Sequence, residues 1–269
     1  MNPKKALALM RGGIMESLHY RLSTFTTLFG NIIYLVLVYF LWKAIYASSG
    51  TDTVGGMTFN DTMIYLILAS ALFYFMEMYL VWDMSFDIQS GRVVLDLLKP
   101  MSYRKYKFWN CTGALIINFV LNFLPTFIIV MIITRGSIPI GINLLYFCIS
   151  TVLALMVNFN IDMLVSTICL YTESTWGINM VKETITLLLS GATIPLAFFP
   201  EEMRKVINWL PFRAIYDAPL NFLLKKGDTD SLAGILSLFA FQASWAIILS
   251  IIGNLFWNRA VRKITVNGG

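Results

Sequence analysis

The sequence predicts an all-α polytopic integral membrane protein with six transmembrane helices and an amphipathic helix at the N-terminus. Of its 269 residues, 58% are hydrophobic and only 13% are charged, whereas about a quarter of a typical soluble domain is charged. The mean hydropathy is +0.71, and aromatic residues make up 14% of the chain, which suits a protein anchored at two lipid interfaces. These values exclude a soluble enzyme, a disordered chain and a disulfide scaffold.

Residues 1–24 are predicted to form an interfacial helix. Their apolar side chains recur at helical spacing, and four basic residues stand against one acid, Glu16. A helix of this composition lies on the membrane surface. A cleaved signal peptide is the alternative, but the apolar run starts only near Phe25 and is too long for a signal sequence.

Six apolar segments then follow, each a candidate for crossing the membrane. They cover about 25–45, 61–82, 111–133, 142–170, 184–199 and 233–257. Six spans of about 20 residues fill a chain of this length with short loops, so we expect residues 1–269 to form a single transmembrane domain. The fifth segment is short and is interrupted by Gly191, Pro195 and Pro200.

The basic residues indicate the orientation of these spans. With six spans and a cytoplasmic N-terminus, thirteen of the 20 basic residues face the cytoplasm, as the positive-inside rule favours. These are Lys4, Lys5, Arg11, Arg21, Arg92, Lys99, Arg104, Lys105, Lys107, Lys182, Arg259, Arg262 and Lys263. The last three would face outside if the fifth segment did not cross. Charge therefore predicts that it crosses, that both termini and the 83–110 loop are cytoplasmic, and that the 200–230 region is extracellular.

Composition also bounds the chemistry. The net charge is +5, but the basic residues lie beside apolar runs, so we expect them to set orientation and not to bind nucleic acid. His19 is the only histidine, which excludes histidine-rich metal sites, and no metal site is predicted. Glu77, Asp83 and Asp87 lack an accompanying nucleophile, histidine base or metal set, so no catalysis is expected.

The 83–110 loop contains a short amphipathic helix in our interpretation. Pro100 ends any helix that begins after Gly91, because proline lacks the N–H and disfavours a helical residue before it. The apolar face comprises Val93, Val94, Leu97 and Leu98, and the charged face comprises Arg92 and Asp96. Such a helix either rests on lipid headgroups or docks into a groove on a soluble partner.

Five polar residues fall inside the predicted spans: Glu77, Asn118, Asn122, Asn158 and Asp162. Two of them share a face of the third span and two share a face of the fourth, four residues apart in each case. Because the two spans are antiparallel, Asn118 and Asp162 lie at similar depth, on the order of 10–12 Å from the cytoplasmic ends. One interpretation is an interhelical hydrogen bond. The other is that Asp162 or Glu77 lines a wet substrate path, since intramembrane carboxylates face an interior.

Two stretches resemble the permeases of ABC-2 type transporters, in the branch of this length that lacks a fused ATPase. From Gly91 to Tyr103 the chain shows a glycine, an apolar pair, an acid, Leu-Leu-Lys-Pro and a following Ser-Tyr. The second match runs from Ser190 through Pro195 and Pro200 to Trp209-Leu210-Pro211-Phe212 and Asp217-Ala218-Pro219. It resembles the family's fifth span and external re-entrant hairpin, and implies an external gate at Gly191, Pro195, Pro200 and Pro211.

The resemblance implies the ABC-2 permease fold and the transmembrane subunit of an ATP-driven exporter in a bacterial plasma membrane. A second permease, identical or homologous, would complete the path, and two cytoplasmic ATPase subunits would bind ATP and Mg. No GxxxxGK[ST] motif occurs, so we expect no cofactor to bind the chain directly. The basic residues Arg104, Lys105 and Lys107 would lie at the membrane surface beside anionic lipid.

The resemblance also assigns residues 87–100 as the coupling helix that enters a cleft on the ATPase. The residues concerned are Asp87, Gly91, Arg92, Val93, Val94, Asp96, Leu97, Leu98, Lys99 and Pro100. Two other classes are open. A secondary transporter would show inverted repeats and midplane ion sites, and a membrane enzyme or assembly factor would show a convergent polar cluster; the sequence shows neither. Drugs, peptides, lipids and polysaccharides all stay open as substrates.

Overall fold

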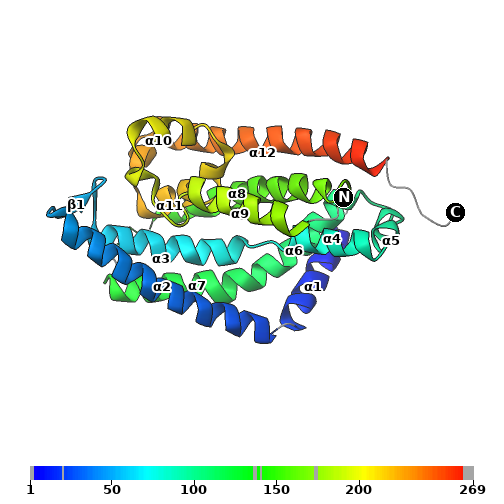
Figure 1. Ribbon diagram of the computed structural model, residues 1–269, viewed down its shortest axis with the longest axis horizontal. Helices are drawn as coiled ribbons and strands as arrows, with labels where there is room; N and C mark the ends of the chain where they lie inside the picture. The colour runs from blue at the N-terminus through cyan, green and yellow to red at the C-terminus, as the bar shows by residue number, and fades with distance from the viewer. Residues whose placement is uncertain (1–2, 20, 136–137, 140, 173–174, 263–269) are drawn as a thin grey trace.

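Long helices packed side by side make up the protein (Figure 1). The computed structural model describes residues 3–19, 21–135, 138–139, 141–172 and 175–262, so Lys263 of the predicted C-terminal basic group lies outside the described residues. The longer helices are α1 (Pro3–His19), α2 (Arg21–Ser49), α3 (Phe59–Met76), α4 (Leu80–Gln89), α6 (Tyr103–Asn118), α7 (Leu124–Ile133), α8 (Ile142–Ile168), α9 (Thr175–Leu189) and α12 (Leu232–Val261).

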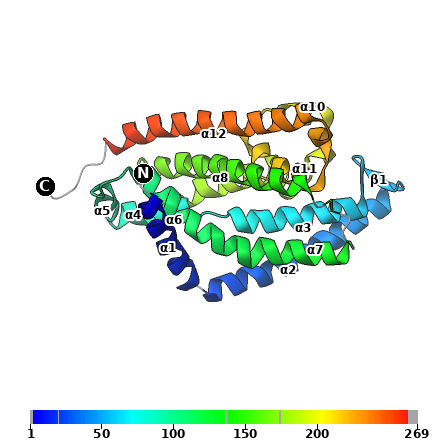
Figure 2. The ribbon, with the colours of Figure 1, turned by 180° about the vertical axis from the view of Figure 1, so that it is seen from behind.

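Short elements connect these helices. They are the β1 (Thr53–Val54) and β2 (Met57–Thr58) hairpin, α5 (Val93–Leu97), the π-helical segment η1 (Phe119–Phe123), α10 (Glu201–Ile207), α11 (Asp217–Leu224), and the 3₁₀ turns η2 (Leu196–Phe198), η3 (Pro211–Ala214) and η4 (Gly227–Asp230). Figure 2 shows, from behind, that α12, α8 and α3 succeed one another across the molecule, with α2 and α7 beyond them.

Five helical stretches are long and apolar enough to cross a membrane, which confirms the all-α polytopic class. They are Phe29–Ser49, Phe59–Gln89, Tyr103–Ile133, Ile142–Ile168 and Leu232–Val261. The fifth predicted span, 184–199, is the one missing from this set; it corresponds to α9, which lies earlier, at Thr175–Leu189, and has 15 residues. A helix of that length rises about 22 Å, which is less than the roughly 30 Å of a hydrocarbon core.

The chain nevertheless passes from one end of the bundle to the other between residues 175 and 197. At the start of α9 the hydroxyls of Ser85 and Thr175 lie 2.6 Å apart, close to the α5 end of the molecule. At the opposite end, Gly55 in the β1–β2 hairpin packs against the backbone of Ala197. Both views place α10 and α11 beside this hairpin, whereas α5, the start of α1 and the end of α12 lie at the other end (Figures 1 and 2). A non-helical continuation therefore completes the passage that α9 begins.

The cytoplasmic loop predicted over 83–110 is wrong in extent. The second span continues as helix α4 to Gln89, and the third span begins with α6 at Tyr103. Only 90–102 connects them, with the five-residue helix α5 at its centre. Gly91 has a φ of +71°, which a residue without a Cβ adopts readily, so the chain can turn sharply after α4.

The second span is broken in the middle, although its sequence there contains neither glycine nor proline. Helix α3 starts at a capping box between Thr58 and Asp61 and ends at Met76, and α4 starts at Leu80. The amide of Asn158 on α8 donates to the carbonyl of Met76 over 2.9 Å, satisfying a backbone group that the break frees. Backbone of this kind is tolerated at membrane depth only inside protein or against a water-filled cavity.

This second span is also the most enclosed one. In its most apolar stretch 67% of the residues are buried, against 11–39% in the other four candidate spans. The remaining spans present large apolar side chains outward, among them Phe40 on α2, Ile132 on α7 and Leu255 on α12. Apolar surface of this extent is suited to lipid, so α3 is the central helix and the others surround it.

Helix α1 packs closely on α6 through two glycines. A Cβ built on Gly13 would lie 2.1 Å from the carbonyl oxygen of Asn110, and one built on Gly113 would lie 2.1 Å from that of Met10. Both distances are far inside van der Waals contact, so the two backbones can approach this closely only with glycine at both positions. The predicted surface helix is therefore docked on the bundle, with Leu7 and Met15 exposed.

A second, smaller apolar core lies at the α5 end. Its buried members come from α4, α5, α6, α8 and α12: Leu80, Met84, Val93, Tyr103, Phe159, Met163 and Trp257. The rings of Tyr103 and Trp257 stack with centroids 4.7 Å apart. This core holds the connecting segment against the ends of the spans.

Candidate functional site

The segment from Ser90 to Ser102 presents apolar side chains to its surroundings. Leu95 and Leu98 are 65% and 76% exposed. Val93 is buried in the smaller core, and Val94 and Leu97 are partly buried against it. The prediction that Leu98 shares one face with Val93 is therefore wrong: the helix ends at Leu97, and Leu98 lies at its C-cap, where it turns away from the core.

Buried ion pairs fasten this segment to the neighbouring helices. The amine of Lys107 on α6 lies 2.8 Å from a carboxylate oxygen of Asp87 on α4 and 3.8 Å from one of Asp96 on α5. The side chains of Lys107 and Asp87 are 9% and 8% exposed. At such depth, removing one partner leaves an uncompensated charge. Asp96 thus lies on the inner side of the segment, whereas Arg92, predicted to share a charged face with it, is exposed.

Two further cations complete this network. Arg92 is exposed and lies 3.7 Å from Asp87, and Lys99 lies 2.6 Å from Asp96. Partial burial by itself lowers the pKa of the Lys99 amine, but the hydrogen bonds to Asp96 and Tyr106 outweigh it, so this pKa lies above its usual value. Gly91 and Pro100, at the two ends of the segment, are exposed.

The expectation that Arg104, Lys105 and Lys107 all lie at the membrane surface is wrong for two of the three. Lys105 is exposed, but Arg104 and Lys107 are buried in the protein. The Arg104 guanidinium donates to the side chain of Asn160 on α8 and to the backbone carbonyl of Ser250 on α12. These contacts hold the start of α6 between two other helices.

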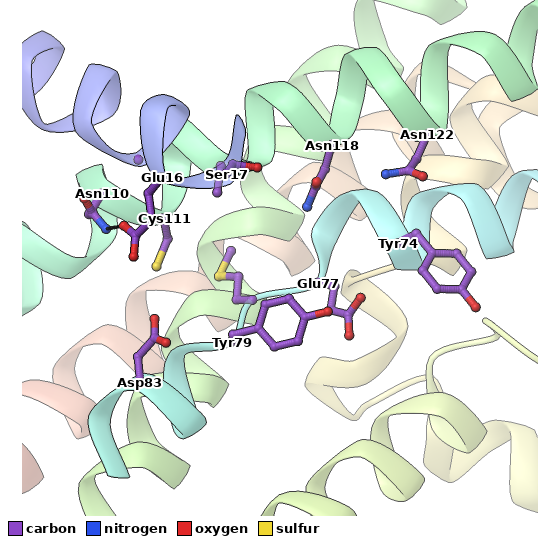
Figure 3. Close-up of a pocket in the computed structure, with 13 residues that line it drawn as sticks. Glu16, Ser17, Tyr74, Glu77, Tyr79, Asp83, Asn110, Cys111, Asn118 and Asn122 are labelled. Carbon is purple, nitrogen blue, oxygen red and sulfur yellow. Dashed lines mark hydrogen bonds between the residues drawn. The ribbon is translucent and has the colours of Figure 1, made fainter. Parts of the chain in front are cut away.

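A polar cavity of about 340 Å³ lies between α1, the break in the second span and α6 (Figure 3). Its lining comprises Gly13, Glu16, Ser17, Tyr74, Glu77, Met78, Tyr79, Asp83, Asn110, Cys111, Ala114, Asn118 and Asn122. The non-helical residues 77–79 form its wall at the centre of the view, and Asn118 points toward them from α6. A cavity of this volume is within the range of small-molecule sites.

Three of the five predicted intramembrane polar residues line this cavity, and the other two lie behind it. Glu77, Asn118 and Asn122 belong to the cavity. Asn158 and Asp162 line a hollow of about 40 Å³ on the far side of the break, which Glu77 also borders. The break therefore separates two polar spaces.

The predicted hydrogen bond between the third and fourth spans is wrong in its partners. Asp162 instead pairs with Lys182 on α9, with 2.9 Å between amine and carboxylate. Asn158 bonds to the backbone at Met76, as described above. Polar contacts do join the helices at this depth, but they connect α8 with α9 and with the break.

Several polar residues that line these spaces were not predicted as site residues, among them Glu16, Tyr74, Tyr79 and Lys182. Glu16 carried a signal, since it is the only acid in residues 1–24. The two tyrosines lie on either side of Glu77 in the sequence, within three residues of it. Lys182 was counted as a topological charge, and its role follows only from the packing of α9 on α8.

The residues predicted to form an external gate lie together at the hairpin end. Gly191 has a φ of +82°, and a Cβ there would lie 2.6 Å from the Tyr65 hydroxyl oxygen. Pro195 and Pro200 precede η2 and α10 at their N-caps, and Pro211 is buried at the start of η3. Each of these prolines stands at the start of a short helical element, where the fixed φ of proline is tolerated.

Buried polar groups hold this end against the spans. Asp217 accepts hydrogen bonds from Tyr65 on α3, from Arg213 and from Asn221. Gln242 on α12 donates to the carbonyl oxygens of Ser150 on α8 and of Ala214. The same Gln242 accepts from the Ser150 hydroxyl.

A lipid-spanning bundle with a broken central helix beside a polar cavity is the architecture of a membrane transport protein. Residues 32–268 match the family described as ABC-2 family transporter protein, and the chain belongs to this family. It is therefore a multi-pass permease component of a transporter, as the resemblance predicted. No curated protein matches the chain.

Proposed function

We propose that the protein is the transmembrane subunit of an ATP-driven exporter. In this proposal a second permease, identical or homologous, completes the substrate path. Two separate ATPase subunits bind ATP and Mg and contact residues 90–102 from the cytoplasm. Family membership favours this function over a secondary transporter and over a membrane enzyme.

The observation that carries the proposal is that the 90–102 segment exposes leucines on its outer side and is held by buried contacts on its inner side. Leu95 and Leu98 project outward, where an apolar groove on a partner can receive them. On the inner side, Val93 is in the smaller core and Lys107 joins Asp87 to Asp96. A segment fastened in this way transmits an applied displacement to the helices that hold it.

Helix α4 leads from this segment to the cavity. It carries Asp87 near its C-terminal end, and its first residue, Leu80, directly follows the break at Glu77–Tyr79. A push on the 90–102 segment would tilt α4 about the break, because residues 77–79 are not helical and no continuous helix joins α3 to α4. Such a tilt would change the width of the cavity between the break and α6.

The charge distribution supports a cytoplasmic α5 end. Helix α1 starts there with Lys4 and Lys5, and α12 ends there with Arg259 and Arg262. Positive charge on that side favours a cytoplasmic location in a plasma membrane, and bacterial membranes are our proposed setting. The hairpin end, with Gly191 and α10–α11, would then face outward as the external gate.

Co-purification with an ATPase tests the proposal. The full chain is co-expressed with an ABC ATPase of the same organism, and the permease is purified from solubilised membranes. Leu95→Asp combined with Leu98→Asp should abolish co-purification of the ATPase, since two charges would enter an apolar groove. Val206→Asp, at an exposed apolar position on α10 at the other end, is the matched control. Unchanged co-purification with the double variant would overturn the proposed contact.

A further inference from the structure

The cavity beside the broken span is acidic. Glu16 from α1, Glu77 from the break and Asp83 from α4 all line it. Among the described lining residues there is no lysine, arginine or histidine. Glu77 is half-buried within a candidate span, where a carboxylate is costly and marks a functional site. Glu16 and Asp83 are more exposed, and three carboxylates around one space give it a negative potential.

The two lysines closest to the cavity form ion pairs with carboxylates outside its lining. Lys107 lies 2.8 Å from Asp87, and Lys182 lies 2.9 Å from Asp162. Both ion pairs lie outside the lining of the cavity. Among the described residues, no lysine or arginine forms a direct ion pair with Glu77 or Asp83, so a cation inside the cavity can approach both carboxylates.

The cavity also contains polar groups that the protein does not satisfy. Asn122 is only 7% exposed and lines the cavity, yet the described part of the chain gives its side-chain amide no hydrogen-bond partner. Asn118, which points toward the break in Figure 3, is likewise without a side-chain partner among the described residues. Asn122 is a buried residue and Asn118 a half-buried one; both amides border the cavity, where a ligand can hydrogen-bond to them.

The geometry is unsuited to a bare metal ion. Within the described residues, no group of three or more histidine, cysteine or carboxylate side chains converges closely enough to hold one. The acids are instead spread around about 340 Å³, and the lining also includes Tyr74, Met78 and Tyr79. Aromatic faces attract organic cations, and methionine adapts to varied apolar shapes.

We propose that this cavity binds amphipathic organic cations, of the class that carries a quaternary or protonated nitrogen on an aromatic or aliphatic body. Glu77 and Asp83 would balance the positive charge, the tyrosine rings would contact the body, and Asn118 and Asn122 would hydrogen-bond to polar substituents. That such a cation is the cargo of an exporter rests on the proposed function. Binding itself requires only the permease chain.

The test compares two probes of nearly identical shape and opposite charge, tetraphenylphosphonium and tetraphenylborate. Binding of each radiolabelled ion to the full chain in lipid nanodiscs is measured, and binding to empty nanodiscs is subtracted. We expect saturable binding of the phosphonium only. Glu77→Gln should weaken it about tenfold or more, since one opposite charge at short range is removed, and Glu77→Asp should retain most of it.

Glu202→Gln is the matched control, because Glu202 is an exposed acid on α10, far from the cavity. It should bind the phosphonium as the unmodified chain does. Equal binding of both probes, or loss of binding in Glu202→Gln as large as in Glu77→Gln, would overturn the inference. So would the absence of saturable phosphonium binding by a chain that still captures its ATPase, a result that leaves the proposed function intact. Phosphonium binding by a chain that captures no ATPase would instead refute only the proposed function.

Discussion

Replacing Lys107 with methionine should strongly destabilise the α5 end of the protein. The substitution keeps most of the side-chain volume but removes the cation that lies 2.8 Å from Asp87 and 3.8 Å from Asp96. Asp87 is almost fully buried and keeps only the exposed Arg92 at 3.7 Å, so it becomes a poorly compensated buried charge. Breaking a buried pair in this way costs about 3–5 kcal/mol.

Thermal unfolding in detergent measures this cost. At roughly 2–4 °C per kcal/mol for a chain of this size, the loss in apparent Tm is on the order of 10 °C. Lys105→Met is the matched control: it removes the same kind of charge two residues away, but from an exposed position, where the cost is within about 0.5 kcal/mol. The samples are heated, cleared and quantified by size-exclusion chromatography.

A double variant separates the ion pair from side-chain packing. Lys107→Met with Asp87→Asn removes both charges, and replacing a whole buried pair is much better tolerated than breaking it. Asp96 keeps Lys99 at 2.6 Å in that variant. The double variant should therefore recover most of the lost stability. If Lys107→Met unfolds at the same temperature as Lys105→Met, the buried network does not fasten the segment and the reasoning fails.

Two glycine substitutions test the close contacts of the fold. Gly13→Val should release α1 from α6, at a cost of about 1–3 kcal/mol from overpacking, and should make the N-terminal helix sensitive to limited proteolysis. Gly12→Val, whose Cβ would meet nothing closer than 3.9 Å, should leave it resistant; equal cleavage of both would contradict the crossing. Gly191→Ala should lower the apparent Tm, because it strains a positive φ and encounters Tyr65. Gly177→Ala, in open space within α9, should leave the apparent Tm unchanged, because it causes neither backbone strain nor a clash. An equal loss of Tm in both variants would refute the close contact at Gly191.

The fold class follows from the sequence because apolar runs of bilayer length are a property of composition alone. The first, second, fourth and last predicted spans all coincide with long helices. The charge argument that the chain passes between residues 175 and 200 also agrees with the structure, which places Thr175 and Ala197 at opposite ends. The extent of the 83–110 loop was misjudged because α4 and the first turns of α6 are amphipathic and carry charged residues.

Partners distant in the sequence could not be predicted. The sequence of the second span has no glycine or proline at the break that would predict it. The break is stabilised by a hydrogen bond from Asn158, on another helix, to Met76. Lys182 meets Asp162 only because α9 folds back on α8. Periodicity places a residue on a face of its own helix, but it does not state which helix covers that face.

The acidic cavity illustrates the same limit. Glu77 was recognised as an intramembrane carboxylate, but Glu16 comes from a helix predicted to lie apart on the membrane surface. The docking of α1 depends on glycines that meet only in three dimensions, Gly13 and Gly113. A site assembled from three separate elements has no contiguous sequence pattern.

In the proposed mechanism residues 90–102 receive the push of a cytoplasmic ATPase, and labelling at position 98 shows whether they face it. Leu98→Cys is introduced into a chain without its native cysteines and expressed with the ATPase. A membrane-impermeant maleimide should label it in inverted vesicles but not in intact cells, and a bifunctional thiol reagent should cross-link it to the ATPase subunit. Labelling in intact cells, or cross-linking no greater than that of Val206→Cys, would contradict the account.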